Sequence, residues 1–150
     1  MGTPPPEFAL ERIYLKDLSF ESPRAPDVFR EPWQPQIQLD INTRTIGLGD
    51  ERFEVVLTVT VNAKSSAGQT QMIVEVQQAG VFRIRGLTED RLRRILATHC
   101  PGILFPYVRE TVDGIVVKGG FPPLMLAPVN FDAMFDEALK RGSNPAQVQH

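Results

Sequence analysis

The sequence predicts an α+β domain in which a four-stranded antiparallel sheet, interrupted by a long crossover loop, precedes helices that pack on one face. Four segments of the first half alternate apolar and polar residues with a period of two. This pattern is typical of strands with one buried and one solvated face. The second half instead repeats apolar residues at helical spacing. Short links between consecutive strands favour antiparallel pairing.

The four predicted strands are Arg12–Glu21, Gln36–Thr43, Arg52–Ala63 and Gln69–Phe82. In the first, strict alternation places Tyr14 and Phe20 on the same side and Ile13 on the other. The link Ser65–Gly68 has the composition of a hairpin turn. We interpret Gly47–Gly49 as a loop between the second and third strands.

The segment Ser22–Pro35 differs from its neighbours because it contains four prolines. Proline lacks a backbone donor and fixes φ, which excludes a helix and a central strand here. The same segment carries Val28, Phe29 and Trp33, which a solvated linker does not need. We therefore expect a loop that lies over apolar surface.

Three helices are predicted in the second half. Thr88 is a suitable N-cap for a helix over Leu87–Ala97. A second helix spans Ile103–Lys118, with Pro106 tolerated in its first turn. A third runs from the cap Asn130 to about residue 141.

Less regular segments surround these helices. Phe121–Val129 is an apolar, proline-rich loop between the second and third helices. Met1–Glu7 is rich in glycine and proline, and Gly142–His150 is polar without periodicity. We expect both ends to be flexible and a single domain to occupy residues 8–141.

Composition narrows the classes of function. The chain has 150 residues and a net charge of −2, which argues against a nucleic-acid binder. Its single cysteine cannot form an intramolecular disulfide, which suits a reducing compartment. No signal peptide is apparent, and the apolar runs are far shorter than the ~20 residues that span a bilayer. We expect a soluble, cytoplasmic protein.

Catalytic and metal sites find little support. His99 and Cys100 are the one plausible catalytic pair, but adjacent residues rarely orient their side chains toward each other, and Pro101 follows at once. A buried thiol is the simpler interpretation. One cysteine and one internal histidine cannot supply the three or four ligands of a usual metal site. No nucleotide-binding motif is present, so we expect no enzyme activity and no cofactor.

Charged residues gather in two places. One is a basic cluster of Arg83, Arg85, Arg91, Arg93 and Arg94, which would suit RNA or acidic lipid but is more simply a solvated face. The other is acidic. Asp17 and Glu21 lie four residues apart on one strand and share a face; Ile73 and Glu75 join them if the fourth strand pairs with the first.

Five motifs together resemble the SecB family of export chaperones. They are Arg12–Glu21 followed by Pro23 and Ala25-Pro26, then Trp33-Gln34-Pro35, EVQQAG at 75–80, CPGILFPY at 100–107 and LAPVNF at 126–131. They occur in the family's order and at similar separations, from about Phe8 to Leu139. The familiar members carry a longer, charged tail, whereas this chain ends in the short, uncharged Pro145–His150.

The resemblance implies a homotetramer, a dimer of dimers, that binds unfolded secretory precursors in the cytoplasm and delivers them to the SecA motor ATPase. By similarity, Asp17, Glu21, Ile73 and Glu75 contact SecA. Clients occupy apolar grooves, for which we expect Phe29, Trp33, Phe121, Leu124 and Met125. Val74 and Val76 resemble the part of the sheet at the oligomer interface. The family also includes chaperones dedicated to toxin–antitoxin pairs, which is the alternative function; RNA or acidic-surface binding is a weaker one.

Overall fold

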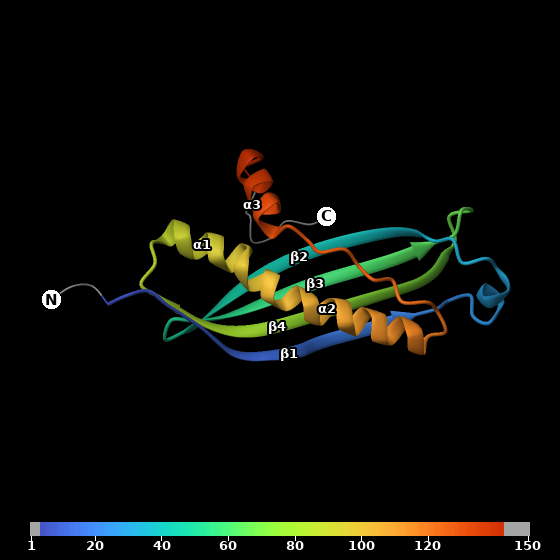
Figure 1. Ribbon diagram of the computed structural model, residues 1–150, viewed down its shortest axis with the longest axis horizontal. Helices are drawn as coiled ribbons and strands as arrows, with labels where there is room; N and C mark the ends of the chain where they lie inside the picture. Colours follow the sequence, from blue (N-terminus) through green and yellow to red (C-terminus); the bar gives the residue numbers. More distant parts are fainter. Residues whose placement is uncertain (1–3, 143–150) are drawn as a thin grey trace.

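The computed structural model describes residues 4–142 of the chain (Figure 1). The strands are β1 (Glu7–Glu21), β2 (Gln36–Gly49), β3 (Arg52–Lys64) and β4 (Thr70–Arg85). The helices are α1 (Glu89–Ala97), α2 (His99–Lys118) and α3 (Phe131–Lys140), with a short 3-10 helix η1 (Asp27–Arg30) between β1 and β2. Neighbouring strands are antiparallel, as the short links between them predicted, and their order in the sheet is β1-β4-β3-β2.

All four strands extend beyond their predicted bounds, β3 by a single residue. β1 begins at Glu7 instead of Arg12, and β4 continues to Arg85. The segment Gly47–Gly49, interpreted above as a loop, completes β2 and pairs with the start of β3. The actual turn consists of Asp50 and Glu51, both at positive φ (53° and 62°). Such a two-residue turn matches the twist of a hairpin and lets both strands run to its edge.

β1 also contradicts strict alternation. Its pairing with β4 shifts between Leu15 and Asp17, which leaves Lys16 as an extra residue in a bulge. Ile13 lies opposite Gly80 and Phe20 opposite Val74, so both face the helices and pack against the core. Tyr14 and Phe20 therefore lie on opposite faces. An inserted residue reverses the side-chain parity of the rest of the strand, and this is why the predicted faces were wrong here.

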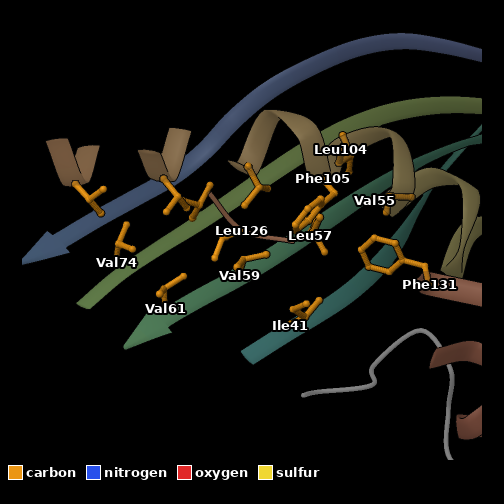
Figure 2. Packing of buried hydrophobic residues seen from close by; sticks show 14 of the residues in the cluster. Ile41, Val55, Leu57, Val59, Val61, Val74, Leu104, Phe105, Leu126 and Phe131 are labelled. Carbon is orange, nitrogen blue, oxygen red and sulfur yellow. The ribbon is translucent and has the colours of Figure 1, made fainter. Parts of the chain in front are cut away.

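The core lies between one face of the sheet and α2. On β3, Val55, Leu57, Val59 and Val61 are completely buried on this face. On α2, Leu104, Val108, Val112 and Val116 recur every fourth residue and are also completely buried. Figure 2 shows Leu104 and Phe105 pointing from the helix toward the sheet. Burial at both surfaces, at ~25 cal/mol per Å² of apolar area, holds α2 against the sheet.

The helix ends were predicted in part. The Thr88 and Asn130 side chains cap α1 and α3 by accepting hydrogen bonds from the backbone N–H groups of Arg91 and Ala133, at 3.4 and 3.0 Å. α2, however, begins at His99, and Pro106 lies inside it. The first turn of α2 contains Cys100 and Pro101, which are both buried. Tertiary burial thus outweighs the hydrogen bond that proline removes.

The segment 22–35 connects β1 and β2, which lie at opposite edges of the sheet. Its residue Val28 is 3% exposed and belongs to the core, and Trp33 packs against the same cluster. The loop therefore lies over apolar surface, as its composition predicted. Residues 1–3 and 143–150 lie outside the described part of the chain, so flexibility of the ends stays a prediction there.

A buried carboxylate ties β1 to β3 on the helix-free face. Glu54, 8% exposed, accepts hydrogen bonds from the Tyr14 hydroxyl and from Lys16 Nζ, the latter at 2.8 Å. These bonds to Lys16 and Tyr14 lower the pKa of Glu54 below its ordinary 4.5. Burial and the bond to Glu54 raise the pKa of Tyr14 to about 12. The Glu54 carboxylate is therefore fully ionised near neutral pH.

The Glu54→Gln variant should show what this carboxylate contributes. Because the folded state lowers the pKa of Glu54, its stabilisation is complete above pH 4.5 and is lost as the pH falls through the folded pKa. We expect the variant to be less stable by about 1–3 kcal/mol at pH 7, with the difference shrinking toward pH 3. Urea unfolding across this range measures it. Glu137→Gln, at an exposed residue of α3, is the control. If the difference in unfolding free energy between Glu54→Gln and the unaltered protein did not depend on pH, the role of this carboxylate would be contradicted.

Candidate functional site

The four predicted SecA-contacting residues lie together on the helix-free face of the sheet. Glu21 is in register with Ile73, and Ser19 with Glu75, so these side chains share one face with Asp17. Sequence reasoning missed Asp40, which the pairing of β2 with β3 and of β3 with β4 places in the same cross-strand row as Glu75. We call this set the acidic surface: Asp17, Glu21, Asp40, Ile73 and Glu75.

The carboxylates of the acidic surface are not neutralised by neighbouring cations. Among residues 4–142, none of the ion pairs includes Asp17, Glu21, Asp40 or Glu75. Glu75 accepts a hydrogen bond from the Thr60 hydroxyl at 3.2 Å. Toward the start of β1, by contrast, Glu7 pairs with Arg85 at 2.5 Å and Glu11 with Arg52 at 2.7 Å. Along β1, the carboxylates near its start are therefore paired, whereas Asp17 and Glu21 near its end are not.

The predicted client-binding aromatics gather on the other face, near the end of α2. The rings of Phe29 and Trp33 lie 5.4 and 5.1 Å from that of Phe121, centroid to centroid. Phe20 approaches the same ring at 6.4 Å. Phe29 is 51% exposed, whereas Phe121 is only 6% exposed. Phe121 is thus a core residue, whereas Phe29 and Trp33 reach solvent at least in part. We call Phe29 and Trp33, which lie over Phe121, the aromatic surface.

Glycines at the end of α2 allow this aromatic packing. A Cβ atom on Gly119 would lie 2.3 Å from the Phe20 ring, and one on Gly120 would lie 2.9 Å from Phe29. Neither distance leaves room for an alanine without movement of the rings. The pair therefore both ends the helix and admits the aromatics of β1 and η1.

The segment 119–130 turns back from the end of α2 and runs alongside it to α3 (Figure 1). Within it, Leu126 is 8% exposed and belongs to the same core cluster as Val59 (Figure 2). Leu124 packs partly against the core, and Met125 is 75% exposed. Leu124 and Met125, both predicted to bind clients, are therefore neighbours that differ in accessibility.

Val74 and Val76, expected at the oligomer interface, lie elsewhere. Both side chains are completely buried beneath α2 in the core of one protomer. β4 is also a central strand, paired with β1 on one side and β3 on the other. Neither valine side chain is exposed in the protomer, and their place at an oligomer interface stays a prediction.

The His99–Cys100 pair does not form a nucleophilic site. Cys100 is completely buried, and burial raises the pKa of its thiol. The His99 ring instead lies edge-on to Phe8, with centroids 4.9 Å apart. A thiol that is neutral and shielded from solvent lacks the thiolate character of a reactive cysteine.

The arginines of the predicted basic cluster lie on separate elements. Arg83 and Arg85 belong to β4, whereas Arg91, Arg93 and Arg94 belong to α1. Arg94 pairs with Asp132 and Asp136 of α3 and lies over the ring of Phe135. The sequence cluster is thus divided between two elements and partly neutralised.

In residues 4–142, no helix has the length and apolarity to cross a membrane.

Comparison with known proteins identifies the family of this chain. The family model for preprotein translocase subunit SecB matches residues 2–142. The protein-export protein SecB of Hahella chejuensis is 57% identical over 136 residues, covering 91% of this chain and 85% of the relative. That of Marinobacter nauticus is 56% identical over 141 residues, covering 94% and 85%. That of Pseudomonas aeruginosa (strain PAO1) is 52% identical over 136 residues, covering 91% and 83%.

A solved structure shares the fold. The SecB-like chaperone of Mycobacterium tuberculosis, in complex with a ChAD peptide from the HigA1 antitoxin, superposes with a TM-score of 0.69 at 21% identity. The superposition covers 82% of this chain and 91% of that one. The family model spans nearly the whole chain, and the relatives exceed half identity over more than nine-tenths of it. The chain therefore belongs to the SecB family of preprotein translocase subunits.

Proposed function

We propose that this protein is a cytoplasmic export chaperone that binds unfolded secretory precursors and delivers them to the SecA motor ATPase. The observation that carries the proposal is the identity of 52–57% to protein-export proteins over most of the chain. Two surfaces would supply the physical means. One is apolar and suits unfolded chains, and the other is acidic and suits a folded partner.

Client binding would use the aromatic surface and the neighbouring loop. Burial of apolar area is non-directional, so it suits a chaperone that must accept many different sequences. Phe29, Trp33, Leu124 and Met125 offer aromatic and thioether groups that adapt to varied partners. Phe121, which is only 6% exposed, packs against the rings of Phe29 and Trp33.

Release would come from a partner, because the chain carries no nucleotide-binding motif. The acidic surface suits docking of a basic patch on SecA, with unpaired carboxylates that raise the rate of encounter. It lies on the opposite face of the sheet from the aromatic surface. A client and SecA would therefore not compete for the same side of the protomer.

A homotetramer is the proposed assembly. β1 lies at the edge of the sheet, and Phe8, Leu10, Leu15 and Leu18 along it are 36–47% exposed. A long, apolar edge strand invites pairing with another chain. On the outer face of α2, Tyr107 and Val117 are 45% and 53% exposed, and nothing lies within 4 Å of a Cβ placed on Gly114. These two surfaces would give a dimer of dimers its two kinds of contact.

A dedicated toxin–antitoxin chaperone has less support. The SecB-like chaperone that carries an antitoxin peptide shares 21% identity with this chain, which indicates the fold alone. RNA binding is weaker still, because Arg85, Arg93 and Arg94 are paired with carboxylates.

The proposal is tested by aggregation of a chemically unfolded precursor after dilution, followed by light scattering without nucleotide. We expect suppression at one tetramer per precursor, and weaker suppression by Phe29→Ala combined with Trp33→Ala. Ile46→Ala combined with Leu48→Ala removes exposed apolar groups from the β2–β3 hairpin and is the matched control. Absence of suppression by the unaltered protein would contradict chaperone function; equal loss in the control would contradict the aromatic surface.

A further inference from the structure

One carboxylate joins α2 to the loop that carries the predicted client-binding residues. Asp113 Oδ1 accepts hydrogen bonds from the backbone N–H groups of Leu124 and Met125, at 3.0 and 3.1 Å. Hydrogen bonds from backbone N–H groups to a carboxylate are stronger than those between neutral groups. Within the described residues, 122–129 make no backbone-to-backbone hydrogen bond outside regular structure. Asp113 thus provides the polar attachment of this loop.

The backbone that Asp113 holds is unusual. Met125 has φ of 53°, in the left-handed region that residues other than glycine seldom adopt. Its neighbours point inward, since Leu126 is 8% exposed and Leu124 packs against the core. Met125 itself is 75% exposed. Strained residues of this kind persist only where the surroundings impose them, and they concentrate at functional sites.

The helix gains little from an aspartate at this position. Asp113 lies in the interior of α2, where aspartate is a poorer helix former than alanine or leucine. Local helix stability therefore does not explain its presence, whereas the two hydrogen bonds to the loop do.

We propose that Asp113 is a positioning residue that holds the loop so that the Met125 side chain stands outward, ready to contact an unfolded client. This inference rests on the proposed chaperone function. A methionine side chain is unbranched and polarizable, so it adapts to varied apolar partners. Fixing its backbone in advance lowers the conformational entropy lost on binding. Asp113 thus raises affinity without itself contacting the client.

The test compares Asp113→Ala, which removes the acceptor, with Asp113→Asn, which keeps the Oδ1 acceptor. Hydrogen exchange followed by NMR should show protected amides at Leu124 and Met125 in the unaltered protein and in Asp113→Asn, and faster exchange in Asp113→Ala. We expect affinity for a fluorescent, permanently unfolded precursor to fall about tenfold in Asp113→Ala and to stay within about twofold in Asp113→Asn.

A double-mutant cycle identifies the residue through which Asp113 acts. In a Met125→Ala background, Asp113→Ala should cause little further loss of affinity, because the contact it positions is already gone. The inference would be overturned if the two amides were as protected in Asp113→Ala as in the unaltered protein. It would also be overturned if Asp113→Ala lowered affinity as much in the Met125→Ala background as it does alone. If the unaltered protein binds no unfolded precursor, the proposed function fails instead, and the exchange rates still decide whether Asp113 holds the loop.

Discussion

Reversing two charges of the acidic surface, by Asp17→Lys with Glu75→Lys, is expected to weaken SecA binding by about 100-fold, or about 2.7 kcal/mol. The two positions lie on the adjacent strands β1 and β4, where the unpaired carboxylates are concentrated. Placing lysines against a basic partner replaces attraction with repulsion between like charges, which costs several kcal/mol across an interface. Affinity for an unfolded precursor should not change, because these residues lie on the helix-free face.

Calorimetric titration of purified SecA measures this effect, with precursor binding followed in parallel. Glu89→Lys with Glu137→Lys changes the net charge by the same amount at exposed residues of α1 and α3, and it should bind SecA normally. The affinity of the unaltered protein should also fall with salt, since screening weakens exposed charges. Equal weakening by the two pairs of substitutions would contradict a specific acidic surface and indicate net charge alone.

Placing glutamates on the outer face of α2, by Tyr107→Glu with Val117→Glu, is expected to break the tetramer into smaller species. Both residues are about half exposed in the protomer, and the proposed assembly would bury them. A charge buried without a partner is strongly unfavourable, and symmetry repeats the penalty at each equivalent contact. The core should stay intact, because neither side chain belongs to it.

Light scattering coupled to gel filtration measures the mass. The unaltered protein should give four times the protomer mass of 16.8 kDa, and the variant a lower multiple. Lys140→Glu on α3 changes the net charge equally and is the control. A tetramer that survives the double substitution would place the contact elsewhere, and a monomeric unaltered protein would contradict the proposed assembly.

Local patterns in the sequence predicted much of this fold. The alternation of β3 and β4, the hairpin after Lys64 and the caps Thr88 and Asn130 all depend on neighbours in the chain. Such features are set by backbone geometry and short-range hydrogen bonds, which periodicity and residue type reveal. The string of motifs indicated the family in the same way, because their order and spacing are properties of the chain itself.

Interactions between distant residues determined the rest. The bulge at Lys16 reverses the faces of β1, and alternation within one strand cannot predict where its partner slips. Asp40 joins the acidic surface only through the strand order β1-β4-β3-β2. The complete burial of Val74 and Val76 follows from the place of β4 inside the sheet.

The chain by itself therefore determined which segments become strands and helices, where they are capped and to which family the protein belongs. Tertiary structure alone decided that Asp40 joins the acidic surface, that Val74 and Val76 are enclosed and that Asp113 contacts the backbone of Leu124. The physical reason is that secondary structure follows from local spacing and hydrogen bonding. Burial and register instead follow from contacts between elements that are distant along the chain, and these exist only once the sheet has formed.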